Sequence, residues 1–142
     1  MQEIKKRIKE HEGYKSQVYT DTLGNFTIGF GHLVRPGEPF VPGFEYPKEQ
    51  LEYLFELDFK NAVKIADQVC EENVLTIPEQ AYGVLIEMAF QLGNKVKKFK
   101  NMIKALQEQD FLEAANQMLQ SAWRKQTPNR CEALAELMRD CQ

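Results

Sequence analysis

The chain has few cysteines, no long hydrophobic run and no excess of positive charge, and each shortage excludes a class of protein. The three cysteines, Cys70, Cys131 and Cys141, are odd in number and far apart, which argues against a disulfide framework or a zinc site and favours synthesis in a reducing compartment. No apolar run approaches the roughly 20 residues that cross a bilayer, and the charged N-terminus lacks the apolar stretch of a signal peptide. We therefore expect a protein that stays in the cytoplasm after synthesis and does not insert into membranes.

The charge balance argues against nucleic acid as a partner. The formal net charge is −3, whereas nucleic-acid-binding domains usually carry a strong basic excess. Any attraction to a polyanion must therefore be local. One basic run could supply it, although a solvated helix face is the simpler interpretation of these residues: Lys95, Lys97, Lys98, Lys100 and Lys104.

The N-terminal part of the chain predicts a short helix followed by a small sheet. Ile4 and Ile8 lie four residues apart within a charged segment, which indicates a helix over residues 3–12 that ends at Gly13. Strand-forming residues then surround an Asp-Thr-Leu-Gly-Asn turn, so residues 17–34 are expected to form antiparallel strands. The proline- and glycine-rich residues 35–47 predict a loop.

The rest of the chain has the periodicity of helices. An apolar stripe predicts a linking helix over about residues 48–70, formed by Leu51, Phe55, Phe59, Ala62, Ala66 and Val69. Further helices are expected after a capping box at Thr76–Glu79, over residues 99–108, after Asp110, and from Pro128 to about Arg139. The predicted fold is one α+β, mainly helical domain over residues 1–142. Its sheet lobe covers about residues 14–47, and its helical lobe covers about residues 76–142 plus the N-terminal helix.

Two carboxyl groups in this part of the chain could support glycoside hydrolysis. That reaction needs an acid that protonates the leaving oxygen and a carboxylate that activates water or attacks directly. Glu12 ends the first predicted helix, and Asp21 begins the turn between strands. Thr27 lies on the returning strand, where its hydroxyl group could hold a water near Asp21. Taken singly, each of these residues is more often an ordinary surface, turn or strand residue.

A family resemblance gives these residues greater weight. Residues 11–33, with their E-G, D-T-x-G and T-I-G-x-G-H motifs, closely resemble the start of the T-even phage lysozymes (glycoside hydrolase family 24). Residues 89–93 (AFQLG) match a second segment of the family, and Trp123 with residues 126–130 (QTPNR) matches a third. The order and approximate spacing agree along nearly the whole chain. The resemblance therefore implies a lysozyme-like fold, with a small sheet lobe joined by a long helix to a helical lobe.

The resemblance also implies an activity and roles for individual residues. Glu12 matches the proton donor of an inverting muramidase, and Asp21 and Thr27 match the pair that positions and activates the attacking water. Such enzymes hydrolyse the β-1,4 bond between N-acetylmuramic acid and N-acetylglucosamine in peptidoglycan. Leu33 and Phe90 match positions that contact the glycan, and Gln91 lies beside them. No metal or organic cofactor is implied.

Two further matches imply structural support. Arg130 resembles an arginine that pairs with the catalytic glutamate, and His32 with Asp58 resembles a buried ion pair between the sheet and the long helix. A cation beside Glu12 would favour the ionised carboxylate, whereas a general acid must hold its proton. We therefore expect activity to fall at alkaline pH.

Two alternatives to a hydrolytic lysozyme remain open. The chain could be a non-catalytic peptidoglycan-binding module, or a lytic transglycosylase that works with one acid and no activated water.

The lysis function that the family implies predicts several further properties. As a phage-type endolysin, the chain is expected to be a monomer. It would act in the periplasm or at the cell wall after a separate holin opens the membrane. The sheet lobe is shorter than in relatives, and Met102, Gln117 and Ala122 depart from the family at positions linked to substrate contact.

Overall fold

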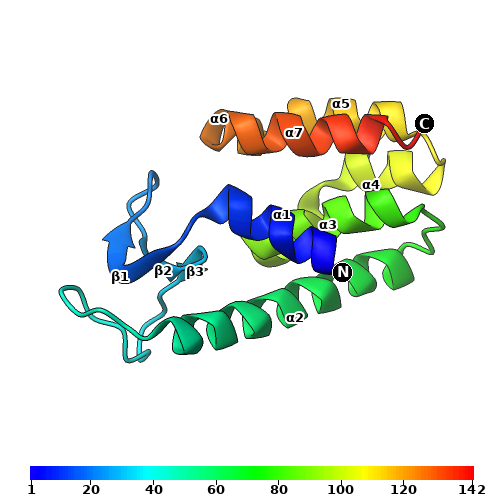
Figure 1. Cartoon of the computed structure of the whole chain (residues 1–142). Coiled ribbons are helices and arrows are strands. Elements are labelled where there is room, and N and C mark those ends of the chain that lie inside the picture. The colour runs from blue at the N-terminus through cyan, green and yellow to red at the C-terminus, as the bar shows by residue number, and fades with distance from the viewer. The chain divides into compact units, whose positions relative to one another are not determined.

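A computed structural model describes all 142 residues, and most of them lie in α-helices (Figure 1). The chain divides into two compact units, Met1–Asn61 and Ala62–Gln142. Seven α-helices accompany one three-stranded antiparallel sheet, which confirms the predicted α+β, mainly helical class. No helix is both long enough and apolar enough to cross a membrane.

The first unit contains the sheet that was predicted for residues 17–34. Its elements are α1 (Gln2–Glu12), β1 (Lys15–Thr20), β2 (Phe26–Gly29), β3 (His32–Leu33) and the start of α2 (Lys48–Glu72). The strands are antiparallel in the order β1-β2-β3, with Thr27 opposite Tyr19 on one side and Leu33 on the other. Thr27 therefore lies on the central strand. Residues 35–47 form neither helix nor strand, as predicted.

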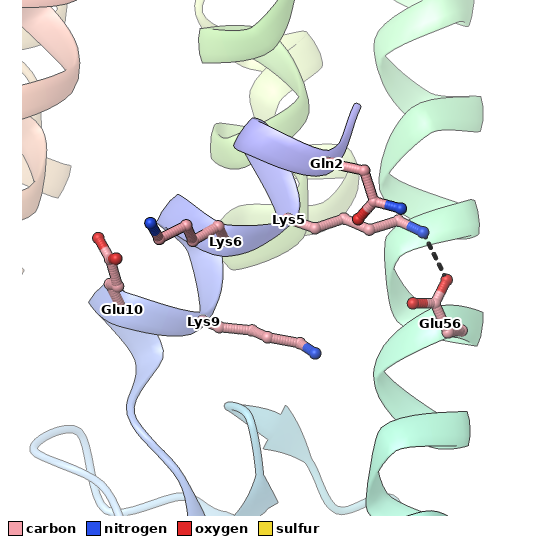
Figure 2. Close-up of a pocket in the computed structure, with 6 residues that line it drawn as sticks. All are labelled: Gln2, Lys5, Lys6, Lys9, Glu10 and Glu56. Atoms are coloured by element: carbon pink, nitrogen blue, oxygen red, sulfur yellow. Dashed lines mark hydrogen bonds and ion pairs between the residues drawn. The ribbon is translucent and has the colours of Figure 1, made fainter.

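Lysines of α1 attach this helix to the sheet and to the first half of α2. Figure 2 shows Lys5 paired with Glu56, and the Lys5 ammonium group lies 2.8 Å from that carboxylate. The ammonium group of Lys9 lies 2.8 Å from the Glu52 carboxylate. Lys9 also lies 4.8 Å from the ring centroid of Phe30. These contacts explain why α1 belongs to the same compact unit as the sheet. The sequence assigns α1 to the helical lobe, and that division into lobes stays a prediction.

The apolar stripe of α2 is buried along its whole length. The boundary between the two units falls within this helix, after Asn61. Every residue of the predicted stripe is at most 5% exposed: Leu51, Phe55, Phe59, Ala62, Ala66 and Val69. The periodicity of the sequence therefore identified the buried face of α2 correctly.

The second unit is entirely helical. After α2 it contains α3 (Glu79–Leu92), the 3-10 helix η1 (Gly93–Lys98), α4 (Lys100–Gln107), α5 (Phe111–Leu119), α6 (Ala122–Gln126) and α7 (Pro128–Arg139). Helix α7 packs against α3, α5 and α6, and α4 packs against α5; α5 and α7 lie side by side in Figure 1. The predicted cap of α5 is present, because the Asp110 carboxylate accepts a hydrogen bond of 3.0 Å from the Glu113 amide.

Two details of the predicted helices are wrong. The N-cap of α3 is Pro78, with no side-chain capping bond, so Thr76 does not form a capping box. The reason is register: a box with Glu79 at the third helical position needs the helix to begin two residues earlier than it does. Helix α6 was not predicted, because five residues are too few to show a helical period.

Candidate active site

Glu12 is the last residue of α1, and the local sequence places it there. Gly13 follows with φ 71°, a conformation that disfavours most other residues, and its amide donates a hydrogen bond of 2.9 Å to the Lys9 carbonyl. Helix α1 therefore ends at Glu12, and its side chain is half-buried at the point where the chain turns towards β1. A carboxyl group at the end of an element is well placed to meet a ligand.

The carboxyl group of Glu12 packs directly against the backbone of Gly31. A Cβ atom built on Gly31 would lie 2.6 Å from Glu12 Cδ and 3.1 Å from Cγ, and it would collide with Oε2. Gly31 connects β2 to β3 and has φ 76°. The turn between these strands thus forms one wall of the space that the Glu12 carboxyl group occupies. The sequence motif contains Gly31, but its contact with Glu12 was not predicted.

Asp21 holds the turn between β1 and β2 through one carboxylate oxygen. Its Oδ1 accepts hydrogen bonds from the amides of Leu23, at 2.9 Å, and Asn25, at 2.8 Å. The Asp21 amide in turn donates to the Asn25 carbonyl at 2.9 Å. These bonds restrain the carboxylate through Oδ1, and Oδ2 takes no part in them. Asp21 is therefore both a turn residue and a carboxylate with one oxygen left for a ligand or a water.

Thr27 is linked to Asp21 through the same peptide. The Thr27 hydroxyl group donates a hydrogen bond of 3.2 Å to the Asn25 carbonyl, the group that also accepts from the Asp21 amide. The hydroxyl proton is thus engaged, and its oxygen lone pairs remain available to accept a hydrogen bond. Only 5% of Thr27 is exposed. The backbone of Asn25, a residue that was not singled out from the sequence, therefore fixes both Asp21 and Thr27.

His32 makes the expected contact with Asp58 and a second contact that was not predicted. Its Nδ1 lies 2.8 Å from Asp58 Oδ2, and its Nε2 lies 3.0 Å from both carboxylate oxygens of Glu38. Burial of the ring tends to lower the pKa of His32, but the two carboxylates outweigh it and raise that pKa above its ordinary value. The cluster joins β3, the loop after it and α2. Its geometry indicates structural support for the sheet.

The loop residue Glu38 was missed because it lies among prolines and glycines that predict only a loop. Its carboxylate also accepts a hydrogen bond of 2.6 Å from the Arg35 amide. Burial tends to raise the pKa of Glu38, but that bond and the His32 ring hold it below its ordinary value. An acidic residue six positions after a histidine is too weak a signal to identify such a contact.

In the second unit, Gln91 is part of a hydrogen-bonded network. Its Oε1 accepts from the Trp123 indole at 3.0 Å, and its Nε2 donates to the Thr127 hydroxyl at 3.1 Å. Trp123 is 3% exposed, so these bonds satisfy a polar group that is out of contact with water. Gln91 keeps one amide hydrogen and one lone pair that this network does not use. Glycan contact by Gln91 stays a prediction.

The remaining predicted residues lie at different places in the two units. Leu33 is in β3 of the first unit and is half exposed, directly opposite Thr27 in the sheet. Phe90 in α3 and Arg130 in α7 belong to the second unit, and both are half-buried. Pairing of Arg130 with Glu12, and glycan contact by Leu33 and Phe90, stay predictions.

The first unit therefore contains a carboxyl group, a fixed carboxylate and a fixed hydroxyl oxygen within one small sheet and the helix before it. These groups are what acid–base catalysis of a hydrolysis requires: a proton donor, a base and a second acceptor for the attacking water. No group of three or more His, Cys, Asp or Glu side chains is arranged to hold a metal ion.

Comparison with known proteins agrees with this chemistry. The family model described as phage lysozyme matches residues 9–139. A probable T4-type lysozyme of Dictyostelium discoideum is 32% identical, with 89% of this chain and 88% of that protein aligned. A peptidoglycan hydrolase of Pseudomonas phage phiKMV is 27% identical over 94% of this chain, which spans 15% of that protein. A SAR-endolysin of bacteriophage PS119 is 23% identical, over 75% of this chain and 60% of that protein.

Proposed function

This chain belongs to the phage lysozyme family, and from that premise we propose how its residues hydrolyse peptidoglycan. The reaction is hydrolysis of the β-1,4 bond between N-acetylmuramic acid and N-acetylglucosamine, with inversion at the anomeric carbon. Glu12 is the general acid, and Asp21 and Thr27 position and activate the water. Leu33, Phe90 and Gln91 contact the glycan, and Arg130 pairs with Glu12.

The proposed acid step begins at the end of α1. Protonated Glu12 donates its proton to the glycosidic oxygen as the bond to the anomeric carbon breaks, which neutralises the departing alkoxide. The Gly31 backbone limits where the carboxyl group can lie, so the proton is delivered from a restricted position. Because only the protonated form donates, activity should fall at alkaline pH. A rate that stays constant well into alkaline pH would contradict this assignment.

One observation supports the water step and carries the whole proposal. Asp21 and Thr27 both form hydrogen bonds with the backbone of Asn25. One hydrogen of the water is donated to Asp21 Oδ2 and the other to the Thr27 hydroxyl oxygen. The lone pair of the water then faces the anomeric carbon. As the new C–O bond forms, Asp21 accepts the proton, and attack from the face opposite the leaving group inverts the configuration.

The experiment that tests this function is mass spectrometry of purified peptidoglycan after digestion by the wild type and by Glu12→Gln. Reducing ends that incorporate ¹⁸O from labelled water, lost in Glu12→Gln, would support hydrolysis by the proposed acid. Anhydro ends would instead identify a lytic transglycosylase. Binding to the wall without any cleavage would identify a binding module.

The biological setting follows from the same proposal. We infer that the chain acts as a monomer on the glycan strands of the cell wall and reaches them from the cytoplasm after a separate holin opens the membrane. A relative named as a SAR-endolysin supports action at the cell wall, whereas the holin and the monomeric state remain parts of the proposal. Expression in a bacterium with and without a co-expressed holin, followed by turbidity, tests it. Lysis that needs no holin would contradict this route.

A further inference from the structure

Loop residues 38–46, which we call the strap, fold back over the side chain of His32. Phe40 meets the imidazole ring edge to face, with ring centroids 6.2 Å apart, and the Glu38 carboxylate lies 3.0 Å from Nε2. Only 7% of the His32 side chain is exposed, so little of the ring is in contact with water. The strap therefore covers a titratable group of the sheet.

The far end of the strap is fixed to β1 through Tyr46. The Tyr46 amide donates a hydrogen bond of 3.0 Å to the Ser16 carbonyl. Within the strap, the Tyr46 hydroxyl group accepts a hydrogen bond of 2.8 Å from the Val41 amide, and the Tyr46 ring packs edge to face on Phe40. The strap thus has a defined closed conformation, although it contains neither helix nor strand.

The hydrogen bonds of His32 require a proton on both ring nitrogens. Nδ1 lies 2.8 Å from Asp58 Oδ2 on α2, and Nε2 lies 3.0 Å from both carboxylate oxygens of Glu38 on the strap. A carboxylate only accepts hydrogen bonds, and a neutral imidazole has a single N–H. Neutral His32 can therefore satisfy only one of its two partners.

The charged groups that face the His32 ring are Asp58 and Glu38. Its partner across the sheet is Ile28, and the aromatic ring above it belongs to a phenylalanine, so neither adds charge. Arg35 attracts Glu38, and its amide donates a hydrogen bond of 2.6 Å to that carboxylate, whatever the charge on His32. The proton on His32 is therefore the variable that decides how firmly the strap is held.

Loss of this proton affects the strap more than it affects α2. Asp58 is held in a 25-residue helix and makes the shorter contact, so we expect the remaining N–H to stay with Asp58. The Nε2 lone pair then faces the two oxygens of Glu38, which is an unfavourable contact between electron-rich groups. Because the strap lacks regular secondary structure, it is the element that yields.

The backbone of His32 connects the strap to the proposed active site. Gly31, the residue before it, is the wall against which the Glu12 carboxyl group packs. Leu33, the residue after it, lies opposite Thr27 in the sheet. Strand β3 has only two residues, so the side-chain contacts on either side of His32 are a large part of what holds it.

We propose that the strap is a pH-sensitive latch on the active site, and that Glu38 is a positioning residue that acts through His32. While His32 is protonated, Glu38 holds the strap closed and β3 in place. When His32 loses its proton, the strap opens and the wall beside Glu12 is less firmly held. The effect on catalysis rests on the proposed function, whereas the opening of the strap rests on the His32 contacts alone.

Amide hydrogen exchange measures the strap without reference to activity. Protection of peptides covering the strap is compared at pH 6 and pH 9, after correction for the intrinsic exchange rate, with peptides of α7 as the internal reference. In the wild type we expect strap protection to fall on the order of tenfold at pH 9, because local opening exposes the Val41 and Tyr46 amides. Protection of α7 should fall much less.

Glu38→Gln should remove this dependence on pH. A carboxamide accepts a hydrogen bond from protonated Nε2 and donates one to neutral Nε2, so the strap can close in both states. Its protection should therefore be nearly equal at pH 6 and pH 9, and should exceed that of the wild type at pH 9. Glu45→Gln is the matched control: it removes a charge from the same strap, but its carboxylate meets the Ser16 hydroxyl group rather than His32, and it should keep the wild-type response.

Initial rates on a soluble peptidoglycan fragment test the positioning role. The ratio of kcat for the wild type to kcat for Glu38→Gln is followed from pH 6 to pH 9, because titration of Glu12 is common to both proteins and cancels. The ratio should fall severalfold, with a smaller change in KM, since the wall beside Glu12 acts on proton transfer. The corresponding ratio for Glu45→Gln should stay constant.

The contrary results are equally specific. Strap protection that does not change with pH in the wild type, or a Glu38→Gln response equal to that of the wild type, would overturn the latch. A constant ratio of kcat would overturn the positioning role of Glu38. If the strap opens with pH but no reducing ends are released at any pH, only the hydrolytic function fails; if reducing ends appear while the strap ignores pH, only the latch fails.

Discussion

The Glu12 carboxyl group occupies the space in which a side chain at Gly31 would begin. The two residues belong to different elements, the end of α1 and the turn between β2 and β3. Because residue 31 has no side chain, it leaves room for the carboxyl group of the proposed proton donor. In addition, its φ of 76° is unfavourable for any residue with a Cβ atom.

Gly31→Ala should reduce activity far more than it reduces stability. The atoms that an added methyl group would meet are at the mobile end of the Glu12 side chain, so the carboxyl group moves while the fold persists. A displacement of about 1 Å in a catalytic group can cost on the order of 100-fold in rate. Positive φ itself costs alanine roughly 1–2 kcal/mol. Initial rates on labelled peptidoglycan and urea unfolding measure the two effects separately.

Gly43→Ala is the matched control for this substitution. Gly43 has φ 91°, but a Cβ atom there would meet nothing within 4 Å. Gly43→Ala should therefore lose about 1–2 kcal/mol of stability, as Gly31→Ala does, but keep its activity. If both variants lose activity in the same proportion, the contact with Glu12 has no role in positioning the acid.

Asp21→Asn and Asp21→Ala should separate the turn role of Asp21 from its chemical role. Asparagine retains a side-chain oxygen that can accept from the Leu23 and Asn25 amides, whereas alanine leaves both donors without this partner. We expect Asp21→Ala to lose about 1–2 kcal/mol of stability and Asp21→Asn much less. Both should lose roughly 10²- to 10⁴-fold in rate, because neither can accept the proton of the water. Near-normal activity of Asp21→Asn would favour a mechanism without an activated water.

The cysteines should be unreactive in the folded protein. Burial raises the pKa of Cys131 to about 11 and also raises the pKa of Cys70 and Cys141. Because the thiolate is the reactive form, few of these groups are ionised at neutral pH. A thiol-reactive dye at pH 7 should label the native chain slowly and all three cysteines rapidly after denaturation. Equal rates for Cys131 in both states would show that the site is open to solvent.

Features that repeat along the sequence could be predicted from it, whereas contacts between individual residues of different elements could not. The apolar stripe of α2 repeats over about six turns, so its period identifies the buried face. Asn25 acts through its backbone, Gly31 through an absent side chain, and Glu38 through a contact across a loop. None of these produces a local pattern. Family motifs singled out Glu12, Asp21 and Thr27. The bonds of Asp21 and Thr27, and the packing of Glu12 against Gly31, became visible only in the structure.

The contacts of His32 should give the fold a stability that depends on pH. The pKa of His32 is raised, so its contribution is complete below the unfolded value of about 6.5 and is lost as pH rises through the folded value. The pKa of Glu38 is lowered, so its contribution is complete above about 4.3 and is lost as pH falls through its folded value. The cluster should stabilise the fold most between these limits. Urea unfolding of the wild type and of His32→Asn at pH 5, 7 and 9 measures the difference, which should shrink as pH rises.

Glu38→Gln should reveal how much of this effect comes from the contact that the sequence did not predict. The substitution removes the charge that faces His32 Nε2 but keeps a side chain of similar size. We expect a loss of about 1 kcal/mol at pH 5–6, because hydrogen bonds to charged groups contribute more than neutral ones and this carboxylate is partly exposed. Glu132→Gln is the control, since its ion pair with Arg124 is about half exposed and should contribute under about 0.5 kcal/mol. Equal losses in the two variants at pH 5–6, or a Glu38→Gln loss that persists unchanged to pH 9, would show that protonated His32 gains nothing from Glu38.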